Sequence, residues 1–197
     1  MSPASGLTSR FQEALDLAFR LHGHAARKAS GVPTMAHLLG VCAIVQHDGG
    51  DEDEAIAALL HDALEDEPGH ISREDIQRQF GGRVLAIVEA STDTPRSYTG
   101  GAKPPWRQRK EAYLAHARLS DPALLRVTVA DKVDNLRSML MDYRREGDAL
   151  WRRFHAGKQE QLWYYRSCLQ AYTEAGCQGL LIDEMRRLLD ELMALTG

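Results

Sequence analysis

The chain has 197 residues, 44% of them hydrophobic, and can therefore bury a continuous core without disulfides or a structural metal. Lysine and arginine number 24 and aspartate and glutamate 28, giving a formal net charge of -4. This balance offers no global electrostatic reason for binding nucleic acid or an anionic membrane, so we expect neither as a partner. We expect one domain spanning residues 1–197.

The cysteines and the apolar runs indicate the compartment. Cys42, Cys168 and Cys177 form neither an even set nor a CxxC pair, which argues against a disulfide framework or a thiolate zinc site. The longest apolar run, residues 55–60, is too short to span a bilayer, and residues 1–10 lack the apolar core of a signal peptide. We expect a cytoplasmic protein in which residues 1–8 are flexible.

Apolar residues recur at intervals of three and four along most of the chain, a pattern typical of amphipathic helices. The sustained alternation of strands is missing. The sequence therefore predicts an all-α fold, a bundle of about eight to ten helices. The helical pattern marks Phe11–Phe19, Leu38–Val45, Ile56–Leu64, Val84–Val88, Ala112–Leu119, Leu124–Leu140, Leu162–Tyr172 and Leu180–Leu192.

Glycine, proline and polar residues separate these segments. Gly49–Gly50 and Gly81–Gly82 mark boundaries, and Ser72 followed by Asp75 resembles a capping box, which predicts a helix start. Residues 92–105 contain three prolines and two glycines, so we predict a long loop there. A loop of that length is either functional or disordered, and we expect it near the functional site.

Four side chains of metal-binding type are distant in sequence, so only a helical bundle could gather them. His37 begins the second helix, His61 and Asp62 lie inside a strongly apolar helix, and Asp131 lies in a later one. Imidazole nitrogen and carboxylate oxygen suit divalent first-row metals, and this set leaves coordination positions for water and phosphate. Because buried ionisable groups need a partner, the sequence predicts one divalent metal ion here.

Helical spacing adds further polar groups to this site. Residues four apart share a face, which places Glu65 and Asp66 one turn beyond His61 and Asp62. These carboxylates can orient or deprotonate a water molecule. The same spacing puts Asn135 one turn beyond Asp131, and asparagine can hydrogen-bond a sugar hydroxyl or phosphate without adding charge.

Each of these residues also has an ordinary structural explanation. A His-Asp dipeptide is common by chance, and a histidine beside an apolar stripe is usually a satisfied core residue. Asp131 could pair with Arg137 or act as a cap. The whole chain could be a structural bundle with solvated acidic residues, although these explanations weaken when they must all hold together.

Several motifs in this order resemble the HD hydrolase domain of RelA/SpoT proteins, and more closely the stand-alone small alarmone hydrolases of the metazoan SpoT-homologue kind. The resemblance runs from about Phe11 to the last helix and implies an HD-domain fold. The synthetase region of long RelA/SpoT proteins does not follow, so alarmone synthesis is not expected. The matching segments are His24–Lys28, Ser30–Pro33, His37, Ala57–Asp66, Phe80–Gly81 and Ala130–Arg137.

The resemblance assigns roles to individual residues. It implies that one Mn²⁺-like ion is held by His37, His61, Asp62 and Asp131. It also implies that Glu65 and Asp66 are the catalytic residues that position and activate the nucleophilic water. Arg27 and Lys28 would face the phosphates or base, and Asn135 the ribose. An ordinary solvated helix end explains Arg27 and Lys28 about as well.

Other residues extend the expected substrate site. Lys103, with Arg107, Arg109 and Lys110, would form a basic rim where a pyrophosphate docks, although a solvated helix face explains Arg107–Lys110 equally well. Lys158 and Tyr164 lie in the segment where related enzymes place a substrate contact, while Trp163 and Tyr165 could simply be core. Where the family often has Tyr-Ile before the first ligand and Pro after it, Thr34, Met35, Ala36 and Leu38 stand here. The missing tyrosine affects base stacking, so the identity of the purine stays open.

The reaction that the resemblance implies is removal of the 3′-pyrophosphate of ppGpp or pppGpp, giving pyrophosphate and GDP or GTP. The same site could act on (p)ppApp, the 2′-phosphate of NADPH or a deoxynucleotide. A nucleotide-binding or antitoxin-like interaction module is the alternative from another class. Glu65 and Asp66 argue against it, because pure binding needs no water activator. The expected partner is a small nucleotide, and no oligomer is indicated.

Overall fold

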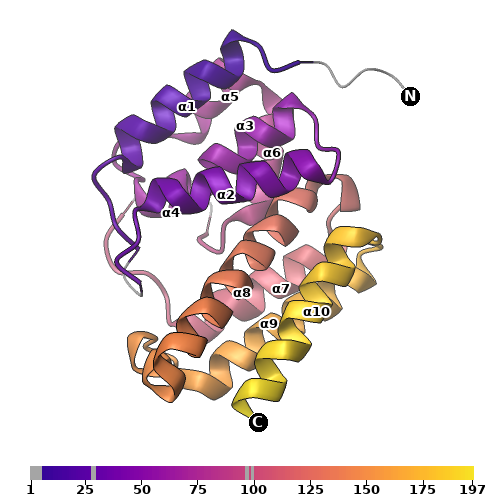
Figure 1. The fold of residues 1–197 in the computed structure, drawn as a ribbon. Helices are drawn as coiled ribbons and strands as arrows, with labels where there is room; N and C mark the ends of the chain where they lie inside the picture. Colours follow the sequence, from indigo (N-terminus) through magenta and orange to yellow (C-terminus); the bar gives the residue numbers. More distant parts are fainter. Residues whose placement is uncertain (1–5, 28–29, 96–97, 99) are drawn as a thin grey trace.

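The computed structural model describes residues 6–27, 30–95, 98 and 100–197, a set of helices joined by loops (Figure 1). No strand occurs in this part of the chain, where an isolated bridge joins Ala26 to Pro33. The all-α prediction is confirmed. The helices are α1 (Ser9–His22), α2 (Thr34–His47), α3 (Glu52–Leu60), α4 (Ala63–Asp66), α5 (Arg73–Phe80), α6 (Gly82–Ser91), α7 (Trp106–Leu119), α8 (Arg126–Glu146), α9 (Gly157–Glu174) and α10 (Leu180–Thr196), with 3-10 turns η1 (Pro122–Leu124) and η2 (Gly147–Arg153).

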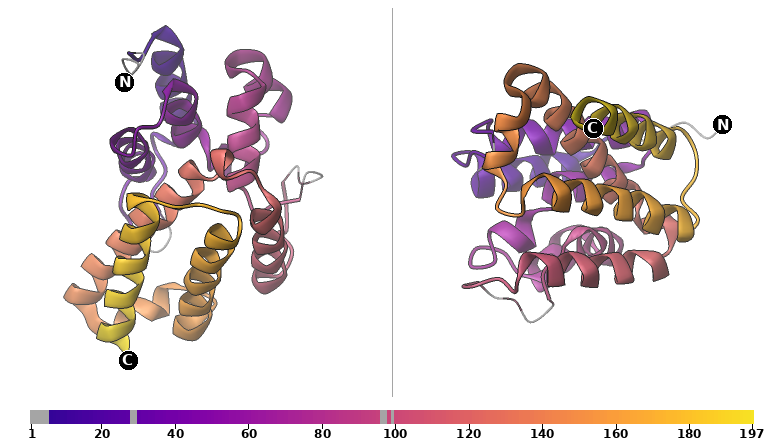
Figure 2. Two further views of the ribbon diagram at one scale, coloured as in Figure 1. Left: turned by 90° about the vertical axis from the view of Figure 1, so that its right-hand side faces the viewer. Right: turned by 90° about the horizontal axis from the view of Figure 1, so that it is seen from below.

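The long helix α8 connects the N-terminal and C-terminal helices. It leaves the group formed by α1 to α6 and runs along α10 into the group that contains α7 and α9 (Figures 1 and 2). Helix α3 packs against α1, α2 and α6, and its residues Ala55–Leu60 are fully buried. The junction of α2, α3 and α8 therefore lies inside the core, and side chains from distant segments meet there.

Local sequence signals account for several helix boundaries. Ser72 and Asp75 form the predicted capping box at the start of α5, and Asp51 and Glu54 form another at α3. Gly81 separates α5 from α6 with φ of 93°, a left-handed conformation that favours glycine. All three cysteines are free thiols, as expected. No described helix has the length and apolar character needed to cross a bilayer.

One helix prediction is wrong. The sequence suggested an uninterrupted helix through His61 and Asp62, but α3 ends at Leu60 and α4 begins at Ala63. The His61 ring nitrogen Nδ1 lies 2.9 Å from the carbonyl oxygen of Ala58, the acceptor that the Asp62 amide would use in an unbroken helix. A side chain that enters the backbone ladder in this way interrupts a helix.

The long loop lies where the sequence placed it. Helix α6 ends at Ser91 and α7 begins at Trp106, and residues 96, 97 and 99 between them lie outside the described residues. At the N-terminus, residues 1–5 also lie outside the described part. Thr8 caps α1 and donates its amide to Glu52 Oε1 at 2.6 Å, and the flexibility expected for residues 1–8 stays a prediction.

We expect Ile56→Ala to lower the free energy of unfolding by about 2–5 kcal/mol, because it leaves a cavity in a tightly packed interior. Ile56 is fully buried in α3, whereas Leu119, at the end of α7, is 90% exposed. Denaturant unfolding monitored by circular dichroism measures both variants. Leu119→Ala is the control and should change stability little, and equal losses in the two variants would contradict this account of the core.

Candidate metal centre

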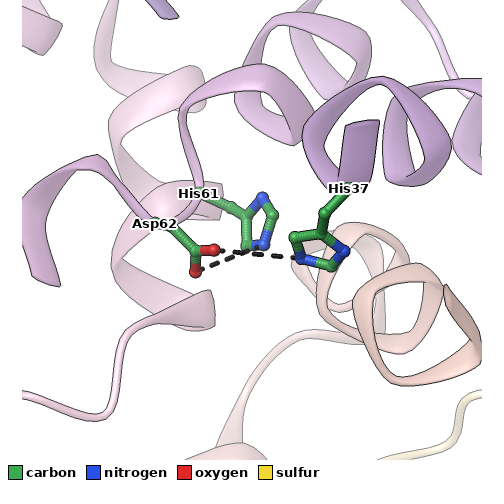
Figure 3. Close-up of side chains that lie close together, drawn as sticks. All are labelled: His37, His61 and Asp62. Carbon is green, nitrogen blue, oxygen red and sulfur yellow. Dashed lines mark ion pairs between the residues drawn. The ribbon is translucent and has the colours of Figure 1, made fainter. Parts of the chain in front are cut away.

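Two histidines and two aspartates from three separate segments meet where α2, α3 and α8 join. One ligand atom each from His37, His61 and Asp62 lie within 4.8 Å of one another, and these side chains point toward a common space (Figure 3). Asp131 joins them from α8, with its Oδ1 3.2 Å from His37 Nε2 and 3.8 Å from His61 Nε2. The predicted convergence of these four side chains is therefore present.

Hydrogen bonds on the far sides of both imidazoles fix their orientation. His37 Nδ1 lies 2.6 Å from Asp134 Oδ2, and His61 Nδ1 lies 2.9 Å from the Ala58 carbonyl oxygen. A carbonyl can only accept, so His61 carries its proton on Nδ1 when it is neutral. Both Nε2 atoms face the cluster, as is usual for histidines that bind a metal.

The donor set fits a divalent cation. His61 is buried, and its Nε2 atom has no hydrogen-bond partner among the described residues. A buried polar atom in that condition is costly unless a ligand or water satisfies it. Two imidazole nitrogens with two carboxylates match the preferences of Mn²⁺, Fe²⁺ or Zn²⁺. The side chain of Asp62 is 32% exposed, so the cluster opens toward solvent on its side.

Mutual attraction holds the metal-free cluster in a charged state. Burial lowers the pKa of His61, but the carboxylates of Asp62 and Asp131 outweigh it and raise the pKa to about 9. The pKa of His37 is also raised, because hydrogen bonds to Asp131 and Asp134 outweigh the effect of burial. Burial would raise the pKa of Asp131, but Lys132 and both histidines hold it well below its usual range. Cation binding must displace these protons.

Lys132 is a buried cation that the sequence reasoning missed. Its ammonium donates to Asp131 Oδ2 and lies 5.5 Å from the ring centroid of Tyr113 and 5.8 Å from that of Tyr164. Aromatic faces attract a desolvated ammonium. Asp131 thus has a balancing cation on the side away from the histidines. The Ala130-Asp131-Lys132 sequence gave no signal that this lysine is buried.

Glu65 lies beside a cationic network built by the long loop and α7. Lys103 Nζ is 2.8 Å from Glu65 Oε1, and Arg109 Nη1 is 3.7 Å from the same oxygen. Asp93, whose side chain is 3% exposed, accepts from both Arg109 and Lys110. Burial and repulsion from Asp93 raise the pKa of Glu65, and Lys103 opposes the shift. A raised carboxylate pKa suits a group that exchanges protons near neutral pH.

The residues of the basic rim do not all face the same way. Arg107 belongs to the solvated helix face, because it pairs with Glu111 and Glu160 and its guanidinium stacks 3.3 Å from the centroid of Trp163. Lys103 and Arg109 instead face Glu65. A contact of these two cations with a phosphate stays a prediction.

Arg27 and Asn135 lie next to the cluster and contact each other. Arg27 donates to Asn135 Oδ1, and Asn135 Nδ2 donates to Asp131 Oδ1 at 2.5 Å. The amide therefore links Arg27 to a predicted ligand. Lys28 lies outside the described residues. Asp66 is exposed and lies one turn after Asp62. Its backbone amide donates to the Asp62 carbonyl oxygen at 2.9 Å.

Two predicted substrate contacts lie differently. Lys158 donates to the backbone carbonyl of Thr196 in the last turn of α10, and its ammonium also lies 3.9 Å from Asp148 Oδ1 in η2. Tyr164 is 4% exposed, and its ring faces Lys110 at 4.5 Å. The buried Tyr164 ring packs against the ammonium of Lys110. Contact of either residue with substrate stays a prediction.

Asp93 and Asp134 are further residues that the sequence reasoning did not assign. Asp134 follows Asp131 by three positions, so a shared helix face was a usable signal. Asp93 stands in the loop before the basic segment, and only the folded chain reveals its contact with Arg109 and Lys110.

The arrangement is that of an all-helical domain with a buried His/Asp centre able to bind a divalent cation. A family model described as HD domain matches residues 14–162. The chain therefore belongs to the HD domain family.

Individual relatives agree with this assignment. The chain is 35% identical over 130 residues to human guanosine-3′,5′-bis(diphosphate) 3′-pyrophosphohydrolase MESH1, an alignment covering 64% of this chain and 68% of the relative. It is 33% identical over 129 residues to the enzyme of the same activity name from Aquifex aeolicus, covering 65% of this chain and 17% of that protein. A solved metazoan SpoT orthologue, described as hydrolysing ppGpp, superposes with a TM-score of 0.76 at 22% identity, covering 96% of this chain and 98% of the other. At that identity the likeness is one of fold.

We expect the thermal stability of the metal-free protein to fall as the pH rises from about 6.5 to 9. The pKa of His61 is raised from 6.5 to about 9, so its stabilising charge is fully present below the lower value and lost as the pH passes the higher one. Thermal denaturation after chelation measures the change in Tm, at roughly 2–4 °C for each kcal/mol.

His61→Asn is the matched control because it removes the titrating ring. Its Tm should depend less on pH over this range. Saturating Mn²⁺ should also weaken the dependence in the unmodified chain, because the ion takes the place of the protons. Identical pH slopes for the two metal-free proteins would rule out the titration of His61 as the cause.

Proposed function

We propose that this chain is a metal-dependent phosphohydrolase that removes the 3′-pyrophosphate of ppGpp or pppGpp, releasing pyrophosphate and GDP or GTP. The observation that carries the proposal is the convergence of His37, His61, Asp62 and Asp131, with Glu65 and inward-facing cations beside them. The activity named for the human and Aquifex relatives supports the choice of substrate.

We further propose Mn²⁺ as the resident ion, held by His37, His61, Asp62 and Asp131. A bound divalent ion supplies Lewis-acid polarisation at a phosphoryl oxygen and makes water more acidic. The proton transfer and the substrate binding are then carried out by side chains of this chain. The cytoplasmic location expected from the cysteine pattern stays a prediction.

Glu65 is the residue best placed to take the proton of the attacking water. It lies one turn beyond Asp62, its carboxylate is mostly buried, and its pKa is raised first by burial and then by Asp93. A carboxylate with a raised pKa is a more effective general base near neutral pH. Asp66, on the same turn but exposed, would orient the water or its hydrogen-bonded neighbours.

Lys103 and Arg109 would bind the phosphates of the substrate. In the structure both lie near Glu65, and Lys103 lowers the pKa of Glu65 against the larger effect of burial. A substrate that carries several phosphate charges competes for these cations. Substrate binding therefore both positions the pyrophosphate and releases Glu65 to act as a base.

Arg27 and Asn135 form the other wall of the site. The guanidinium of Arg27 can donate to a phosphate or to the base of the nucleotide, and Asn135 can hydrogen-bond the ribose while keeping its bond to Asp131. This wall would hold the nucleoside while the cationic side holds the leaving pyrophosphate.

We expect Glu65→Gln to keep the metal and to lower turnover by roughly 100-fold or more, the usual scale for lost general-base catalysis. Asp62→Ala should lose both metal and activity, because it removes a ligand. Elemental analysis of the purified variants, together with a steady-state assay, separates these effects. Full turnover by Glu65→Gln would exclude Glu65 as the base.

The substrate is tested by incubating the Mn²⁺-loaded protein with ppGpp, pppGpp, ppApp, NADPH and deoxynucleotides while following pyrophosphate and phosphate separately. We expect pyrophosphate release from the guanosine alarmones. Phosphate release from NADPH or a deoxynucleotide alone would overturn the proposed reaction. Tight nucleotide binding without turnover would indicate a binding module instead.

We expect Lys103→Met to lower kcat/KM for ppGpp by about 10–100-fold, mainly through KM, because a charge-assisted hydrogen bond contributes about 1.5–3 kcal/mol. Arg107→Met is the matched control. Arg107 lies on the same rim but pairs with Glu160 on the outer face, so its loss should leave kcat/KM nearly unchanged. Similar losses in both variants would point to a diffuse electrostatic effect.

A further inference from the structure

Asp134 contacts the metal cluster from behind His37. Its Oδ2 lies 2.6 Å from His37 Nδ1, and its side chain is 18% exposed. Asp134 stands three residues after Asp131 on α8, so both carboxylates face α2. One of them meets the Nε2 edge of the His37 ring, and the other meets its Nδ1 edge.

Gly40 makes room for this carboxylate. It lies in α2 one turn after His37, and a Cβ atom built on it would lie 2.6 Å from Asp134 Oδ1 and 3.3 Å from Asp134 Cγ. Contacts under 3.0 Å force a neighbour to move, and the Asp134 carboxylate is the group that would have to move. The glycine thus permits the close approach of α2 and α8 that places Asp134 on the ring.

We propose that Asp134 is a positioning residue for the metal ligand His37, and that Gly40 is required to seat it. The inference rests on the proposed metal site and deepens it. Asp134 accepts a hydrogen bond from His37 Nδ1–H and so keeps the lone pair of Nε2 directed into the cluster. A carboxylate acceptor also makes the imidazole a stronger donor to a cation.

The second histidine provides an internal comparison. His61 donates its Nδ1 proton to the neutral carbonyl of Ala58, whereas His37 uses an anionic carboxylate. Hydrogen bonds to ionised acceptors are stronger than those to neutral ones. Loss of Asp134 should therefore affect the orientation and donor strength of His37 and leave those of His61 intact.

The first test is Mn²⁺ affinity of the chelated full-length protein, measured by isothermal titration calorimetry. We expect Asp134→Ala to weaken Mn²⁺ binding by about 10–100-fold, the range found when such supporting groups are lost. Asp134→Asn keeps an oxygen acceptor of similar shape, so it should recover much of the affinity. An Asp134→Ala protein that binds Mn²⁺ as tightly as the unmodified chain would overturn the proposal.

Gly40→Ala tests the same contact from α2. Alanine is a better helix former than glycine, so this variant should fold normally. It should nevertheless weaken Mn²⁺ binding, because the new methyl group displaces the carboxylate from His37. In an Asp134→Ala background the same change should have little further effect, since the displaced group is already gone. Additive losses in this double-mutant cycle would contradict the assigned contact.

A spectroscopic readout separates positioning from general structural damage. In the Zn²⁺-loaded protein, the Nδ1 proton of His37 should resonate far downfield and move upfield in Asp134→Ala, while the His61 signal stays in place. Unchanged His37 and shifted His61 signals would refute the assignment. If the unmodified chain binds neither Mn²⁺ nor Zn²⁺, the metal site itself fails and this inference with it. Normal metal binding in Asp134→Ala removes the inference alone.

Discussion

The burial of ionisable groups where α2, α3 and α8 meet is the constraint on which the site depends. Removing an imidazole or carboxylate from water is unfavourable unless partners offset the loss of hydration. Here the inner groups are supported from outside: Ala58 binds the far side of His61, and Lys132 the far side of Asp131. These outer contacts orient the inner donor atoms toward one another, so the fold preorganises the cluster for a cation.

A second network of charges joins Glu65 to the long loop and α7. Asp93 holds Arg109 and Lys110, and Lys103 from the same loop holds Glu65. Positive and negative side chains alternate along this network, so each buried charge is balanced by its neighbours. A change at the loop therefore reaches Glu65 directly. Residues of the long loop thus set the charge environment of Glu65.

The sequence was sufficient to predict the helical class, because helical period is a local property. The meeting of His37 with the His61-Asp62 pair was predicted from ligand chemistry and from the resemblance to a known family. It was not sufficient to predict the break at His61, which arises from a bond between the ring and a backbone carbonyl in the preceding turn. Asp134 shares a face with Asp131, yet its role depends on how closely α2 approaches. The contact of Asp134 with His37 depends on packing between distant segments, and no local pattern encodes it.

Asn135 joins Arg27 to Asp131 without adding a charge to the buried cluster. It accepts from Arg27 and donates to Asp131, so it transmits a contact in both directions while adding no charge. A carboxylate there would repel Asp131, and an apolar side chain would leave Arg27 without its acceptor. The neutral amide keeps Asp131 Oδ1 anionic and aligned with His37. Asn135 therefore couples the position of Arg27 to that of Asp131.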